Sequence, residues 1–168
     1  MIYGGKILCF CLILLISGLV GCSTEEKFVK YEDKEHDFSF VYSNIFKEEN
    51  KEKDKFALVD GDDNVIIFMI NENPTSDDVL ELGKEQAYLD LSTQMRNKED
   101  IDKQVKIVKT KTNDWYTYAI EFSGEGAKSI VSGTFCEGKS IMVVLVTKDN
   151  DYERNKEEYM RVVGSFEC

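Results

Sequence analysis

The five cysteines have the most distinctive chemistry in this 168-residue sequence. Cys9 and Cys11 lie inside an apolar run, Cys22 follows that run, and Cys136 and Cys168 lie toward the other end of the chain. A cysteine sulfur can carry a lipid, bind a metal or pair with a second cysteine. No CxxC motif or other metal-ligand spacing accompanies these positions. Lipid attachment and disulfide formation are therefore the reactions that they indicate.

A short apolar segment before Cys22 has the length of a signal-peptide core. One cation, Lys6, precedes it, and residues 7–20 are almost wholly apolar. This run is shorter than the ~20 residues that span a bilayer, although a permanent anchor helix is the alternative. Residues 19–22, Leu-Val-Gly-Cys, resemble the lipobox of bacterial lipoproteins. The resemblance implies that residues 1–21 are a signal peptide and that Cys22 is lipidated, with acyl chains such as palmitate anchoring the protein.

The charge of the chain excludes some kinds of partner. Asp and Glu number 32 against 21 Lys and Arg, which gives a net charge of −11. So acidic a surface argues against binding nucleic acid and against electrostatic attachment to anionic lipid. We therefore expect the lipid on Cys22 to hold the protein at the extracytoplasmic face of a cell membrane, or elsewhere in the cell envelope. Residues 22–35 would form a polar tether, and residues 36–168 one globular domain.

Other residues with chemical potential give weaker signals. His36 is the one histidine, and we interpret it as a surface or capping residue. Residues 60–64 lack the glycine and glutamate that continue a calcium loop, and residues 124–129 lack a glycine that a phosphate loop requires. The acidic residues are so numerous that chance pairs carry no information. The sequence thus predicts no catalytic residue, no metal ligand and no cofactor.

Trp115, Tyr116 and Tyr118 form an aromatic group in an alternating segment. One interpretation places Tyr116 and Tyr118 in a core and Trp115 on the opposite face under a helix. The other is a partly exposed patch, centred on Trp115 and Tyr118, that docks a protein partner. Both interpretations remain open from the sequence.

Several strands and two helices must position these residues. Residues 65–70 are apolar on both faces, which predicts a central strand covered on both sides. Residues 45–54 are charged and predict a solvated loop. Thr75 or Ser76 would cap a helix that ends near residue 96, and Asn150 with Glu153 would cap a last helix over about residues 151–163. Further strands are expected at residues 38–42, 56–59, 105–110, 115–122, 129–136 and 140–147.

This order predicts an α+β protein with a central antiparallel sheet flanked by helices on both faces, an α/β/α sandwich. Over roughly residues 31–166 the chain resembles the PsbP-like family, whose founding member is an extrinsic subunit of photosystem II. The matching features are the segment 36–42, the long helix after a hairpin, the strand meander, and the ending Val-Val-Gly-Ser-Phe at residues 162–166. The resemblance implies the same sandwich fold and an accessory or binding role, with no photosynthetic role or metal residue carried over.

That layout bears on Cys136 and Cys168. A last helix of about 13 residues spans ~20 Å, comparable with the seven or eight residues of a strand at ~3.3 Å each, so it would return the chain end toward Cys136. Two cysteines in an exported domain favour a disulfide where the compartment oxidises them. Two unpaired thiols are the alternative.

We therefore expect a membrane-anchored extracytoplasmic lipoprotein that acts as a non-enzymatic binding or assembly module on an unidentified protein partner. No oligomeric state is predicted. One alternative is a ligand-capturing lipoprotein, which would show a deep apolar pocket between helix and sheet. Another is a hydrolase that uses acidic residues, which would show carboxylates gathered in a cleft.

Overall fold

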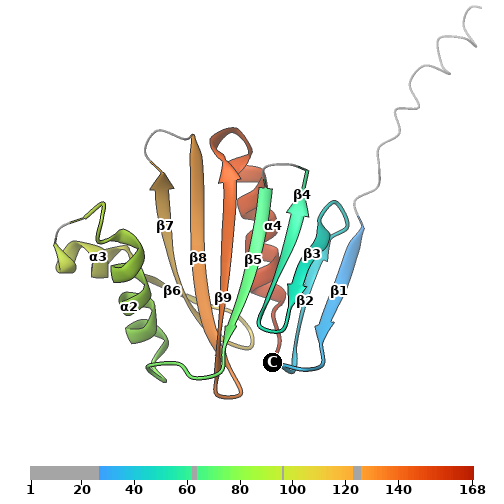
Figure 1. The fold of residues 1–168 in the computed structure, drawn as a ribbon, viewed down its shortest axis with the longest axis horizontal. Helices are drawn as coiled ribbons and strands as arrows, with labels where there is room; N and C mark the ends of the chain where they lie inside the picture. The colour runs from blue at the N-terminus through green and yellow to red at the C-terminus, as the bar shows by residue number, and fades with distance from the viewer. Residues whose placement is uncertain (1–26, 62–63, 96, 123–125) are drawn as a thin grey trace, which may run out of the picture.

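A seven-stranded antiparallel sheet forms the centre of the molecule (Figure 1). The structure, a computed structural model, describes residues 27–61, 64–95, 97–122 and 126–168. Cys22, the predicted signal peptide and parts of the 60–64 and 124–129 stretches lie outside these residues. The strand order is β3-β4-β5-β9-β8-β7-β6. The strands are β3 (Lys47–Glu52), β4 (Lys55–Asp60), β5 (Asn64–Asn71), β6 (Lys106–Lys109), β7 (Asp114–Phe122), β8 (Ala127–Cys136) and β9 (Lys139–Lys148).

Helices cover both faces of this sheet, so the predicted α+β sandwich is confirmed. One face carries α4 (Tyr152–Ser165), which follows a short 3-10 turn, η2 (Asp149–Asp151). The other carries α2 (Val79–Leu91) and α3 (Lys98–Gln104). None of the described helices is both long and apolar enough to cross a membrane.

A separate hairpin, β1 (Phe28–Asp33) and β2 (Phe38–Ser43), lies beside α4 on the first face (Figure 1). The predicted tether is therefore wrong for the residues of β1. Tyr31 is 5% exposed, and its ring stacks on Phe40 at 4.9 Å and on Phe56 at 4.7 Å between centroids. Tyr31 thus packs β1 against the core, and backbone pairing with β2 holds the rest of the strand in place.

Aromatic rings fill the core between the sheet, the hairpin and α4. Phe40 and Phe56 each stack on Phe68, at 4.6 and 4.3 Å between centroids. Trp115 is fully buried and meets Phe166 edge-on at 5.2 Å. This core joins strands from the middle of the chain to its last residues.

Three local predictions are wrong. Residues 45–54 contain β3, an edge strand whose charged side chains suit an exposed sheet edge. The cap of α2 is Asp78, whose side chain accepts a hydrogen bond from the Glu81 N–H at 2.8 Å, rather than Thr75 or Ser76. The residue before α4 is Asp151, which makes no side-chain capping bond, so the predicted Asn150–Glu153 capping box does not form.

Candidate functional site

The second face of the sheet is only partly covered, and this uncovered part is the candidate site. Side chains of β5 that point to the first face, such as Ile66 and Phe68, are fully buried. Their neighbours on the second face, Ile67 and Met69, are half-buried. In Figure 1 α2 and α3 lie to one side of the sheet, while β9 and β5 have no described helix in front of them. The predicted cover on both sides of residues 65–70 is thus wrong for this face.

Two glycines explain why α2 lies close to β7 and β8. The ring of Tyr116 on β7 lies between Gly83 of α2 and Gly133 of β8. A methyl group added at Gly83 would lie 2.5 Å from Tyr116 Cβ, and one added at Gly133 would lie 2.3 Å from Tyr116 Cζ. The helix therefore approaches this ring more closely than any residue with a side chain would allow, which fixes one wall of the site.

Tyr118 ties the same helix to the sheet through a hydrogen bond. Its hydroxyl donates to Asp90 Oδ2 at 2.6 Å, and Gln86 Nε2 donates to Asp90 Oδ1 at 3.2 Å. Burial raises the pKa of Tyr118, and the hydrogen bond to Asp90 raises the pKa further, so the phenol remains a donor. Asp90 is thereby held in place along the wall of the site.

A cleft of about 560 Å³ runs between the C-terminal part of α2 and the exposed sheet. Gln86 and Asp90 of α2 form its polar wall, together with Thr93 and Gln94. A second cleft of about 240 Å³ adjoins it through shared lining residues. The floor is apolar and comprises Met69, Ile120, Val131, Met142, Val144 and Val146, with Ser129. Such a surface suits an apolar group or side chain that a few polar groups orient.

The predicted aromatic patch is not a partner surface, and that prediction is wrong. Trp115 is fully buried in the first core, and Tyr118 is 3% exposed beneath α2. The alternation was interpreted correctly, because the two residues point to opposite faces of β7. Phe166 near the chain end covers Trp115, and helix α2 covers Tyr118. The sequence around the two residues does not indicate either contact.

The two C-terminal cysteines lie together. Cys136, at the end of β8, forms a disulfide with Cys168, and their Cα atoms are 5.5 Å apart. Asn113 Nδ2 donates to Phe135 O at 2.8 Å and lies 3.2 Å from Cys168 Sγ. Cys22, the predicted lipidation residue, lies outside the described residues.

His36 was interpreted as a surface or capping residue, and the surface position is wrong. Its side chain is 1% exposed and lies between the carboxylates of Asp33 and Asp54. The alternating aromatic residues Phe38, Phe40 and Tyr42 could have indicated this position, because their burial places the preceding turn against the first core.

No protein-family model and no curated protein matches the sequence. Among solved structures, the cyanobacterial PsbP of Synechocystis sp. PCC 6803 is similar at a TM-score of 0.63 and 17% identity, over 84% of this chain and 92% of that one. A protein from Bacteroides thetaiotaomicron is similar at a TM-score of 0.58 and 15% identity, over 83% of this chain and 47% of that one. At these identities the likeness concerns the fold, and the chain has a PsbP-like fold.

Proposed function

We propose that this protein is a lipoprotein, anchored through Cys22 at the extracytoplasmic side of a membrane, whose PsbP-like domain is a non-enzymatic binding or assembly module. The observation that carries the binding role is the apolar floor beside α2, in which Met69, Met142, Val144 and Val146 are half-buried. A floor of this kind, bordered by polar residues, is typical of a contact surface for another molecule. The proposal assigns no catalytic residue.

The mode of attachment rests on the sequence. The chain has a net charge of −11, so electrostatic attraction does not bind it to an anionic membrane. An acyl anchor at Cys22 supplies the attachment instead. Metabolic labelling with a palmitate analogue tests this part. We expect label and membrane recovery in the native protein and loss of both in Cys22→Ala. Membrane recovery that persists without label would contradict the lipid anchor.

The contact surface is tested separately by crosslinking in cells and mass spectrometry. Val146 lies in the cleft floor, and Val146→Glu places a charge there. Ile107→Glu is the matched control, because Ile107 is an apolar strand residue that is 38% exposed and does not line the cleft. We expect a partner that is lost in Val146→Glu and retained in Ile107→Glu. Equal loss or equal retention in the two variants would reject the cleft as the contact surface.

Capture of a small apolar ligand is the second candidate function. The cleft volume of about 560 Å³ lies within the range of small-molecule sites. The Gln86 amide and the Asp90 carboxylate on α2 would orient polar groups of such a ligand. Native mass spectrometry of protein extracted from membranes distinguishes the two functions, because a small molecule retained by the native chain and lost in Val146→Glu favours capture.

A further inference from the structure

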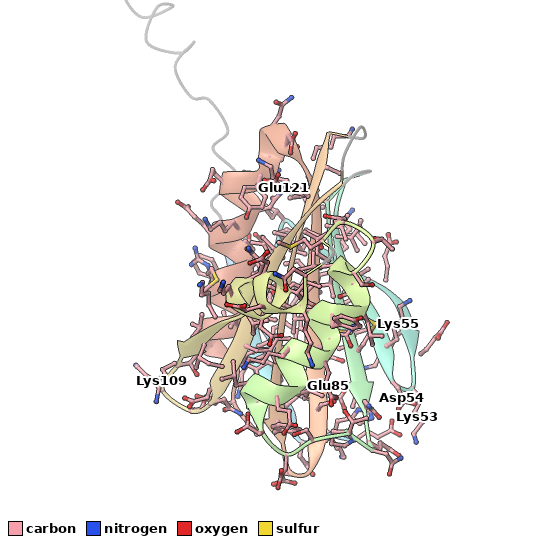
Figure 2. The ribbon with its side chains drawn as sticks, turned by 90° about the vertical axis from the view of Figure 1, so that its left-hand side faces the viewer. Lys53, Asp54, Lys55, Glu85, Lys109 and Glu121 are labelled. Carbon is pink, nitrogen blue, oxygen red and sulfur yellow. A yellow bond between two sulfur atoms is a disulfide. The ribbon has the colours of Figure 1, made fainter. Side chains whose placement is uncertain are left out.

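Three turns that are far apart in the sequence meet at one end of the molecule. His36 lies in the β1–β2 turn, Asp54 in the β3–β4 turn, and Glu72 directly after β5. These turns lie along the lower edge of the ribbon in Figure 1, and Figure 2 labels Asp54 at the corresponding end. The Ile70 N–H donates to Asp54 O at 2.9 Å, which holds the β3–β4 turn beside the end of β5. One potential ligand atom from each of the three side chains lies within 4.8 Å of the others.

Asp33 fixes the orientation of the His36 ring. Its Oδ1 atom accepts the backbone N–H groups of Glu35 and His36, both at 3.0 Å, and lies 3.2 Å from His36 Nδ1. Asp33 Oδ1 already accepts two backbone N–H groups and so acts as an acceptor, which means that Nδ1 carries the proton and donates it to Asp33. In the neutral ring, Nε2 then keeps a free lone pair.

The opposite ring nitrogen is buried and has no hydrogen-bond partner within the described part of the chain. Its nearest carboxylate oxygen, Asp54 Oδ1, is 3.5 Å away. A buried nitrogen without a partner is uncommon in a folded protein and calls for a reason, of which an ion is one. The arrangement of carboxylate, histidine and open nitrogen is the one that orients histidines toward metals in proteins.

We infer that His36, Asp54 and Glu72 bind one divalent transition-metal ion of the zinc type, through His36 Nε2 and a carboxylate oxygen from each acid. An imidazole nitrogen selects zinc-like ions over calcium and magnesium, which prefer oxygen ligands alone. Three protein ligands leave a coordination position for water. Asp33 is a positioning residue in this site and touches no metal.

The site can close around an ion at small cost. Zinc ligands lie about 2.0–2.2 Å from the metal, so the carboxylates must approach the ring nitrogen. The Asp54 and Glu72 side chains are each 49% exposed and have room to rotate. Glu72 must release Lys53 Nζ, which lies 3.4 Å away and is 60% exposed. Exposed ion pairs of this kind contribute little to stability, so an ion readily displaces the lysine.

Calorimetric titration of zinc chloride into the full chain, purified without a histidine tag and treated with EDTA, tests the inference. The variant Asp54→Asn with Glu72→Gln removes both acids but leaves the buried ring in place. Glu121→Gln with Glu153→Gln is the matched control, because it lowers the negative charge equally at exposed positions. Figure 2 shows Glu121 at the opposite end of the molecule from Asp54. We expect one zinc per native chain, an affinity at least ~10-fold weaker in the first variant, and no change in the control.

Nitrogen NMR supplies a second readout, because the chain has one histidine and its signals need no assignment. We expect a proton on Nδ1 before zinc is added and a shift of the Nε2 resonance upon addition. Equal zinc affinity in the two double variants would overturn the inference. So would an apo ring protonated on Nε2, or an Nε2 resonance that zinc leaves unchanged.

Discussion

Tyr116 determines how closely helix and sheet approach each other. Its ring occupies the space that side chains would otherwise fill at Gly83 and Gly133. Burial raises the pKa of its phenol, in agreement with a ring enclosed on both sides. The position of α2, which forms the wall of the cleft, thus depends on the absence of a side chain at Gly83 and at Gly133.

Replacing Gly83 should therefore destabilise the protein. Gly83→Ala places a Cβ against the Tyr116 ring and should cost about 1–3 kcal/mol through overpacking. Gly164→Ala is the control, because Gly164 is also helical and a Cβ there meets nothing within 4 Å. The control should be neutral or up to ~1 kcal/mol more stable, since alanine favours a helix. Urea unfolding measures both, and equal stabilities would contradict this account of the contact.

The residues of the proposed metal site could not be found from their spacing. His36, Asp54 and Glu72 follow no local motif, and each lies in or after a different turn. Only the placement of the β1–β2 hairpin against the sheet brings the first turn to the other two. Tyr31 stacks on Phe56 of β4 and Phe40 stacks on Phe68 of β5, so side-chain packing rather than strand pairing supplies that placement. A lone histidine is uninformative until this packing is known.

At the scale of elements, the apolar patterns were reliable and the charged segments were not. The runs at 56–59 and 65–70 became β4 and β5, because burial of their apolar side chains fixes the register in which the two strands pair. By contrast, β1 and β3 are charged strands whose stability comes from their neighbours. Their charged residues have a low propensity for strands, so the local sequence pattern predicted a tether for β1 and a loop for β3.

Helix α4 and the chain end are attached to the core by several contacts. Ser165 Oγ accepts the Val41 N–H at 2.9 Å, and the Ser39 and Glu167 backbones exchange two hydrogen bonds of 2.8 Å. The disulfide between Cys136 and Cys168 adds a covalent link over a sequence separation of 32. Because the non-covalent contacts already hold the chain end, the bond acts mainly by restricting the unfolded chain.

Removal of the disulfide should accordingly lower stability without changing the fold. Cys136→Ala with Cys168→Ala should reduce the free energy of unfolding by ~3–4 kcal/mol, the value expected for a closed loop of this length. Urea unfolding measures the loss, and circular dichroism checks the fold. Reduced native protein, measured under the same conditions, controls for the side-chain changes. Uptake of two alkyl groups by denatured protein without reductant would contradict the bond itself.

Across the whole molecule, tyrosine is buried in both cores. Tyr159 lies within the first core and donates from its hydroxyl to Val143 O at 2.9 Å, while Tyr116 and Tyr118 lie in the second. Burial is the main cause that raises the pKa of each phenol. In Tyr42 burial and a hydrogen bond to Glu48 raise the pKa to about 12. Burial also raises the pKa of Tyr31. The folded state therefore retains phenol protons that the unfolded chain releases near pH 10.

This difference predicts a loss of stability in alkali. A raised pKa in the fold leaves stability intact below about pH 10, and above it the unfolded chain binds fewer protons, so the free energy of unfolding falls as pH rises. Urea unfolding followed by Trp115 fluorescence, the signal of the single tryptophan, should show a plateau up to pH 9 and a decline from pH 10 to 11.5. Tyr118→Phe removes one such proton and should decline less steeply, although it is less stable at neutral pH because Asp90 Oδ2 loses the Tyr118 hydroxyl that donates to it. An equal slope in this variant would mean that Tyr118 ionises within the fold, which would contradict its enclosure beneath α2.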